Sequence, residues 1–300
     1  MPSDKYDVAV IGGSFSGMSA ALQLARAARR VAVIDDNEAL KTRILPSHGM
    51  LGSDGMPPSE IAGHARTQLL RYPNVSWINE NASDLGGSLD KFSIALTSES
   101  KVEARRVILA LGTEFSLPPI DGIDMLWGKT AFNCPYCHAY EHKGGKLAVL
   151  RVDTAPIYEA LLYPDWGNVT LLMDGQELPD AETRLVAQRG TSVDTRGINR
   201  LELPCRVVFD DGQSSDFSAL FLSPIYSVPL FVRRTECDVV SSSRGNILKV
   251  DAVGKTSVDG IYGCGTVATA NATLPDVVAS GAKVGKAVHA SFYFSTMAKG

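Results

Sequence analysis

Two cysteines three residues apart, with a histidine directly after the second, stand in the segment Cys134-Pro135-Tyr136-Cys137-His138. Such a pair can ligate zinc, form a structural disulfide, or exchange electrons with a substrate through its thiolates. A histidine suits the redox case because its unperturbed pKa lies near neutrality, so it can take up or return the proton that moves with each thiol. The rest of the chain distinguishes among these three possibilities.

Composition and charge favour the redox interpretation. The 300 residues are 45% hydrophobic and 21% charged, with a net charge of −4, as in an ordinary globular protein. That charge gives no general attraction to nucleic acid or to an anionic membrane, and no apolar run approaches the roughly 20 residues of a membrane span. A strand pattern that starts at Tyr6 leaves no room for a leader peptide, so we expect a cytoplasmic protein. Disulfides in the cytoplasm are usually transient and catalytic.

The zinc and structural alternatives have less support. Four residues of the segment could contribute to a zinc site: Cys134, Cys137, His138 and His142. However, no second CxxC and no distant Cys/His pair at ligand spacing follows, so we predict no metal site. The three remaining cysteines show no paired spacing and are predicted to be small buried hydrophobic residues: Cys205, Cys237 and Cys264.

The N-terminal residues have the pattern of a dinucleotide-binding βαβ unit. An apolar strand over 8–11 leads into a turn of the form Gly-x-Ser-x-x-Gly, a helical pattern follows, and a second strand over 31–34 ends in Asp35. Backbone amides of this turn are predicted to bind a pyrophosphate, and Asp35 the adenosine ribose. The predicted turn comprises Gly12, Gly13, Ser14, Phe15, Ser16 and Gly17.

A second strand-helix-strand pattern, from Leu147 to Leu172, has lost these features. Its turn is Arg-Val-Asp-Thr-Ala-Pro over 151–156 and contains no glycine. Side chains stand where a pyrophosphate would approach, and Asp153 adds negative charge there. No arginine cluster follows the second strand to hold a 2′-phosphate. We therefore predict a nucleotide-binding scaffold that no longer binds a nucleotide.

Further segments complete the predicted sites. A strand ends at Gly112-Thr113, and another ends in Gly-Cys-Gly-Thr over 263–266, before a helix predicted to open at Pro275. The long loop over 41–58 contains His48, and long loops in compact domains are often functional. Asn133 is predicted to cap a short helix at the cysteine pair, with Pro135 in its first turn. The positive end of that helix would lower the thiol pKa.

In this order, these features resemble the low-molecular-weight thioredoxin reductase family over essentially the whole chain. The resemblance implies two Rossmann-like α/β domains, the second inserted in the first. Residues 1–116 and 244–300 would form an FAD-binding domain, and residues 117–243 a degenerate NAD(P)H-type domain carrying the CxxC. Members of this family are usually homodimers. In the family geometry Cys137 faces the flavin, and Cys134 meets the substrate. By the same resemblance the flavin contacts outside the turn are Asp35, Arg43, His48, Gly112, Thr113, Gly265, Thr266 and Val277.

Three departures refine the resemblance. The second glycine fingerprint is absent, His138 stands where thioredoxin reductases usually have Asp, and Thr266 replaces an Asp that contacts the flavin. The CxxC-His pattern is more similar to the gliotoxin- and holomycin-type dithiol oxidases, which pass electrons to oxygen. We therefore predict an FAD-dependent oxidase of a small-molecule dithiol or a thioredoxin-like protein, with Cys134, Cys137 and His138 as catalytic residues. A thioredoxin reductase fed by ferredoxin and a flavin-binding redox sensor without turnover are the alternatives.

Overall fold

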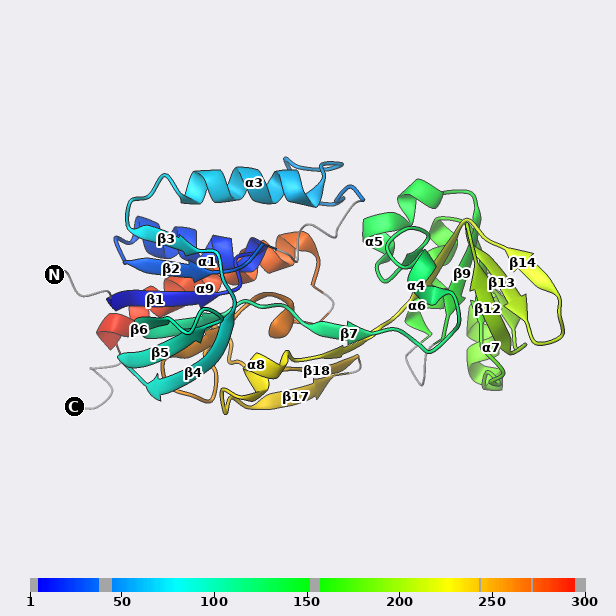
Figure 1. Ribbon diagram of the computed structural model, residues 1–300. Coiled ribbons are helices and arrows are strands. Elements are labelled where there is room, and N and C mark those ends of the chain that lie inside the picture. The colour runs from blue at the N-terminus through cyan, green and yellow to red at the C-terminus, as the bar shows by residue number, and fades with distance from the viewer. Residues whose placement is uncertain (1–4, 38–44, 152–156, 243, 271, 295–300) are drawn as a thin grey trace. The chain divides into compact units, whose positions relative to one another are not determined.

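The computed structural model describes residues 5–37, 45–151, 157–242, 244–270 and 272–294 (Figure 1). The chain divides into two compact units. The first contains residues 1–114 and 226–300, and the second contains residues 115–225. A four-stranded sheet of order β17-β18-β16-β7 includes the two segments where the chain passes from one unit to the other.

The first unit is built on a seven-stranded, mostly parallel sheet. Its strands lie in the order β3-β2-β1-β6-β5-β4, and β19 pairs with β6. The strands β5 and β4 are antiparallel to their neighbours. The bounds are β1 Lys5–Ile11, β2 Val31–Ile34, β3 Val75–Ile78, β4 Ala82–Ser88, β5 Lys91–Leu96, β6 Lys101–Leu109, β7 Glu114–Ser116, β16 Ile225–Ser227, β17 Val239–Ser242, β18 Gly245–Leu248 and β19 Ile261–Gly263; the helices are α1 Phe15–Arg26, α3 Pro58–Leu69, α8 Leu230–Arg233, η3 Gly265–Val267 and α9 Leu274–Phe294.

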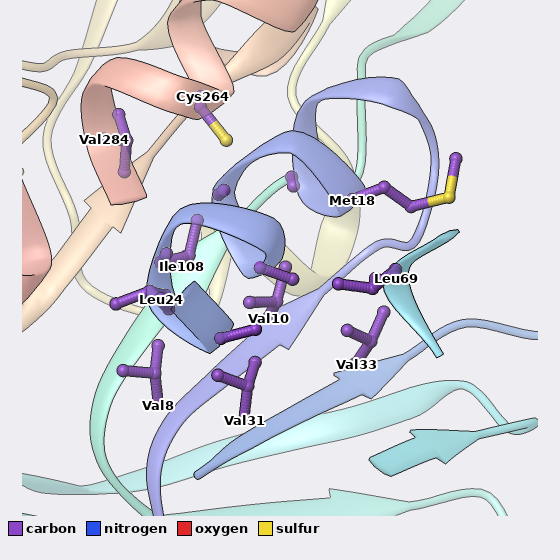
Figure 2. Packing of buried hydrophobic residues seen from close by; sticks show 14 of the residues in the cluster. Val8, Val10, Met18, Leu24, Val31, Val33, Leu69, Ile108, Cys264 and Val284 are labelled. Atoms are coloured by element: carbon purple, nitrogen blue, oxygen red, sulfur yellow. The ribbon is translucent and has the colours of Figure 1, made fainter. Parts of the chain in front are cut away.

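The central strands of this sheet are buried on both faces, which explains their continuous runs of apolar residues. Val8, Val10 and Ile108 belong to the hydrophobic cluster beneath α1, α3 and α9. Figure 2 shows them with Met18 and Leu24 of helix α1. Alternate residues of the same strands enter a second cluster on the other face, because side chains alternate along a strand.

Helices α1 and α9 lie against each other at backbone distance. A Cβ on Gly281 would collide with the backbone oxygen of Ser16, and a Cβ on Gly285 would lie 2.5 Å from the backbone oxygen of Ala20. The Ser19 hydroxyl donates to Val278 O at 2.7 Å, across 259 residues of sequence. Only glycine permits this approach, which aligns the two helices.

The boundary of the inserted unit differs from the sequence-based prediction. The sequence places the end of the insertion at residue 243, but residues 226–242 lie in the first unit. The reason is burial of apolar side chains. Val228, just before α8, and Val232, within α8, are buried with Leu248 in the second hydrophobic cluster of the first unit.

The second unit has a five-stranded parallel sheet of order β11-β10-β9-β15-β8, with a small antiparallel sheet β12-β13-β14 beside it. Its core is a cluster that includes Ala148, Leu220 and Phe209. This confirms a second Rossmann-like α/β unit. The bounds are β8 Ala131–Phe132, β9 Lys146–Leu150, β10 Asn168–Leu172, β11 Ser192–Asp194, β12 Ile198–Glu202, β13 Arg206–Phe209, β14 Ser214–Asp216 and β15 Ala219–Leu222; the helices are α4 Ile123–Leu126, α5 Pro135–His138, η1 Tyr140–His142, α6 Tyr158–Leu162, η2 Tyr163–Asp165 and α7 Asp180–Gln188.

Among the described residues, no helix is long and apolar enough to cross a membrane.

Candidate active site: a dinucleotide cradle and a disulfide

The glycine turn and the predicted acid meet at the carboxyl ends of β1 and β2. The Gly13 N–H donates to Asp35 Oδ2 at 2.6 Å, and the Asn37 N–H donates to Asp35 Oδ1 at 2.7 Å. Gly12 adopts a φ of 100°, which favours glycine, and its N–H donates to Ile34 O. A carboxylate has about four acceptor sites, so two bonds leave Asp35 able to accept ribose hydroxyls.

The first turn of helix α1 follows directly after this glycine turn. Ser14 takes the N-cap position without a side-chain capping bond, and Phe15, Ser16 and Gly17 open the helix. The first N–H groups of a helix have no partner within it, so they are suited to bind phosphate oxygens. A Cβ on Gly17 would collide with Gly12 O, which explains why a glycine is needed there. Serine at position 14, where the fingerprint usually has its middle glycine, thus leaves the backbone cradle intact.

A second set of residues approaches the first turn of α1 from the C-terminal segment. A Cβ on Gly265 would lie 2.5 Å from Ser16 Oγ and 3.7 Å from Val277 Cγ1. The Gly265 N–H donates to Ser280 Oγ at 2.9 Å. A Cβ on Gly112 would lie 3.4 Å from Thr266 Oγ1, and Thr113 follows directly. The structure therefore brings together most of the predicted flavin contacts from four distant segments.

The N-terminus of α9 is capped by its own first turn. The Thr273 N–H donates to Asp276 Oδ2 at 2.9 Å, and the Thr273 hydroxyl bonds to the same oxygen. These hydrogen bonds hold the pKa of Asp276 below its ordinary value. The carboxylate of Asp276 thus turns back on Thr273, as in a capping box. The helix begins at Leu274, one residue before the predicted Pro275.

These groups fit the diphosphate and ribose of a dinucleotide. The cradle is lined by glycines at which a Cβ would collide with neighbouring atoms, and the first N–H groups of α1, which have no partner within the helix, lie next to a carboxylate with spare acceptor capacity. Two predicted contacts are less defined. Arg43 lies outside the described residues. His48 Nδ1 lies 3.6 Å from Asp54 Oδ1, within its own loop, so its role at a flavin stays a prediction.

Sequence reasoning missed three residues beside Asp35. The Trp77 ring occupies the space where a Cβ on Gly13 would lie, and Trp77 Nε1 donates to Asp35 O at 3.3 Å. The Arg66 guanidinium lies 4.0 Å from the centroid of the Trp77 ring and donates to Asn37 Oδ1 at 2.9 Å. The only signal in the sequence was Trp77 at the middle of a strand. Its position next to β2 depends on the sheet order.

The cysteine pair lies in the second unit as a disulfide. Cys134 and Cys137 are bonded, with Cα atoms 5.3 Å apart, and both are half-buried. Helix α5 begins at Pro135, as predicted, but its N-cap is Cys134 and not Asn133. The helix is a single turn of four residues, so its dipole is small and the expected effect on the thiol pKa is weak. Among the described residues, no group of side chains could hold a metal ion.

Aromatic side chains surround α5. The His138 ring stacks on the Phe132 ring, with centroids 4.3 Å apart and planes 24° apart. Tyr136 lies between the two cysteines, 65% exposed, and meets the Trp166 ring edge-on at 5.8 Å. The half-buried disulfide thus lies beside an exposed tyrosine, and its neighbouring histidine is held by a buried ring.

Two comparisons identify this architecture. Residues 6–152 match the family described as pyridine nucleotide-disulphide oxidoreductase. The crystal structure of an oxidoreductase from Agrobacterium tumefaciens is 37% identical, with a TM-score of 0.92, over 97% of this chain and 99% of that one.

The chain belongs to the pyridine nucleotide-disulphide oxidoreductase family. It is similar to HlmI, whose crystal structure is 29% identical with a TM-score of 0.87, over 99% of this chain and 95% of that one. It is also similar to the thioredoxin reductase tcpT of Claviceps purpurea, 33% identical over 50% of this chain and 48% of tcpT. The chain spans about half the length, or less, of the first curated relatives it matches. Thioredoxin reductase-like members of this oxidoreductase family are flavoproteins with FAD as the cofactor, and the cradle of the first unit fits it.

Proposed function

We propose that this protein is an FAD-dependent thiol–disulfide oxidoreductase that works without NAD(P)H and oxidises a dithiol to a disulfide, with oxygen as the acceptor. The observation that carries the proposal is the Cys134–Cys137 disulfide, which is only half-buried, with His138 directly after Cys137 in the sequence. A permanent structural bridge would need neither the exposure nor a neighbouring acid–base group.

The chemistry proceeds by thiol–disulfide exchange. One thiolate of the substrate attacks Cys134, which forms a mixed disulfide and releases Cys137 as a thiolate. The second substrate thiolate then closes the substrate disulfide and releases Cys134. Two electrons pass from the substrate to the cysteine pair, and the substrate's two protons pass to the cysteines and to nearby bases such as His138. A bound FAD, which the cradle around Gly12, Gly17 and Asp35 would hold, would supply the two-electron acceptor for the cysteine pair, with oxygen as the final acceptor and hydrogen peroxide as its product.

Two features of the second unit support independence from NAD(P)H. The segment 151–156, after β9, has no glycine in the sequence, although residues 152–156 lie outside the described residues. Arg196, just after β11 at the carboxyl edge of the sheet, is paired with Asp194 at 2.6 Å and Asp211 at 3.4 Å. An arginine engaged in this way is poorly placed to bind a 2′-phosphate.

The relatives give a second candidate. Because tcpT is named a thioredoxin reductase, reduction of a thioredoxin-like protein is a candidate direction, with an electron donor such as ferredoxin. A redox sensor without turnover is a third. From the resemblance to the low-molecular-weight thioredoxin reductase family we propose a homodimer. From composition and cysteine usage we propose a cytoplasmic location.

An anaerobic panel of electron donors tests the proposal. The flavin absorbance of the purified protein is recorded after addition of NADPH, NADH, dithiothreitol or reduced ferredoxin. We expect bleaching by dithiothreitol alone, and return of the absorbance in air with one hydrogen peroxide per flavin. Cys137→Ser should keep the bound flavin and lose the dithiol reaction, and Cys205→Ala is the matched control at a buried cysteine.

Each alternative has its own outcome in this panel. Rapid bleaching by NADPH would overturn the proposed independence from nicotinamide. Bleaching by reduced ferredoxin with no reaction of dithiothreitol would favour the thioredoxin reductase. A flavin that no donor reduces would favour the redox sensor without turnover. A preparation that binds no FAD would contradict the proposal that FAD is the cofactor.

A further inference from the structure

One buried phenylalanine contacts both histidines of the disulfide segment. The Phe132 ring stacks on His138 at 4.3 Å, and the His142 ring lies 5.7 Å from the same Phe132 centroid at 40°. Phe132 comes two residues before Cys134 in the sequence, and His138 and His142 follow Cys137. The disulfide and both histidines thus belong to the same short segment of chain as Phe132.

The sheet of the second unit holds Phe132 in place. Strand β8 pairs in parallel with β15, with Phe132 in register with Phe221. The two rings lie 5.9 Å apart, and only 4% of Phe132 is exposed. Ala139, between the two histidines, is fully buried, and its N–H donates to Pro135 O. The rigid sheet therefore fixes the ring, and the ring limits the orientations of the imidazoles.

The reaction proposed above needs proton acceptors. Each dithiol oxidised to a disulfide gives up two electrons and two protons, and thiolates are the reactive species. One histidine beside the cysteines can accept one of these protons. A second neutral imidazole nearby would accept the other.

His142 has the properties of such a group. Burial lowers the pKa of His142, and the neighbouring Glu141 carboxylate opposes this effect. The net effect is a pKa below the ordinary value of 6.5, which favours the neutral imidazole, the form that can accept a proton. The rings of His142 and His138 both lie against Phe132, and β8 and β15 contribute the apolar rings of Phe132 and Phe221.

We propose that Phe132 is a positioning residue that holds His138 and His142 against one ring, so that His142 serves as the second proton acceptor of the disulfide centre. This inference rests on the proposed thiol–disulfide chemistry. In the forward direction, the first substrate thiol gives its proton to His138 and the second gives its proton to His142. The two protons then return to the cysteine sulfurs or pass to solvent, so that the exchange is balanced.

The exchange half-reaction tests this inference without the flavin. Flavin-free protein is mixed anaerobically with dithiothreitol, and the rate of thiol release from Cys134–Cys137 is measured between pH 5.5 and 8.5. For His142→Gln we expect a rate lower on the order of tenfold near pH 6.5, less than the 10²–10⁴ typical of a principal acid–base group because His138 remains. The deficit should disappear toward pH 8.5, where the dithiol ionises without a base. His64→Gln, at an exposed histidine of α3, is the matched control.

Variants of Phe132 separate positioning from folding. Phe132→Leu should reproduce the slow exchange below pH 7 and shift the imidazole NMR signals of both histidines, and Phe132→Tyr should restore the wild-type profile. Phe209→Leu removes a buried ring elsewhere in the same unit and should lower the melting temperature without changing the pH profile.

The outcomes are distinguishable from failure of the proposed function. If wild-type protein does not exchange with dithiothreitol, the proposed chemistry itself is wrong. If wild-type protein exchanges and both His142→Gln and Phe132→Leu keep its pH profile, the positioning role is wrong and Phe132 only fills the core.

Discussion

The Gly13 N–H and the Asp35 carboxylate are joined by a 2.6 Å hydrogen bond between the turn after β1 and the end of β2. This bond fixes the acid beside the first turn of α1, where phosphate and ribose of a dinucleotide would lie next to each other. The Trp77 ring fills the space beside Gly13, so any side chain at residue 13 would displace the ring.

Replacing this carboxylate should weaken flavin binding. Asp35→Asn keeps the size of the side chain but turns an N–H toward one of its hydrogen-bond donors. A hydrogen bond to a charged group contributes about 1.5–3 kcal/mol, so we expect FAD affinity to fall by roughly 10- to 150-fold in equilibrium dialysis. Asp36→Asn, at the adjacent carboxylate that accepts from Asn81, should bind FAD normally. Equal affinities for both variants would remove Asp35 from the site.

The close approach of α1 and α9 should not tolerate a methyl group. In Gly281→Ala the new Cβ would collide with the backbone of Ser16, which cannot move independently of α1. We expect a loss of about 1–3 kcal/mol of unfolding free energy in urea, together with weaker FAD binding. Gly63→Ala, at an exposed position of α3 where a Cβ would meet nothing within 4 Å, should instead stabilise the protein by about 0.5–1 kcal/mol. A neutral Gly281→Ala would contradict the observed helix packing.

A buried arginine makes part of the stability dependent on pH. Arg106, 2% exposed, pairs with Asp90 at 2.8 Å. Burial alone would raise the pKa of Asp90, but hydrogen bonds and charges from Arg106 and Arg105 lower it below its ordinary 3.8. A lowered pKa means that the native state favours the ionised form, so this contribution is complete above about pH 4 and is lost as the pH falls through the native pKa.

Asp90→Asn should therefore be less stable than the wild type by about 1–2 kcal/mol at pH 7, a value reduced because Asp90 is 43% exposed. The difference should shrink as the pH falls below 4. Urea unfolding at pH 7, 5 and 3 measures it, with Asp84→Asn on exposed β4 as the control. A difference that stays constant with pH would show that the charge of Asp90 is not its cause.

Only the redox cysteines should react with thiol reagents in the folded protein. Burial raises the pKa of Cys264 to about 12 and that of Cys205 to about 11, and Cys237 is also buried. Thiolates at these two sites are therefore rare at pH 8. After mild reduction, mass spectrometry should find two alkylated residues in native protein, Cys134 and Cys137, and all five cysteines in urea. A third label without urea would indicate local opening.

The sequence by itself determined the elements whose signals are local. The strand-turn-helix-strand pattern with Asp35 predicted β1, α1 and β2, and the CxxC spacing predicted the disulfide, because each pattern lies within one continuous stretch of sequence. The sequence predicted Asn133 as the N-cap of α5, whereas the N-cap in the structure is Cys134. Local residue preferences distinguish poorly between two adjacent cap positions.

Only the tertiary structure decided which distant residues meet. The contact between Ser19 and Val278, the ring of Trp77 beside Asp35, and the two imidazoles on Phe132 all depend on packing across separate elements. The end of the inserted unit moved to residue 225 because Val228 and Val232 bury their side chains in the first unit. Such contacts follow from how buried surfaces fit together, and a linear pattern of residue types does not specify that fit.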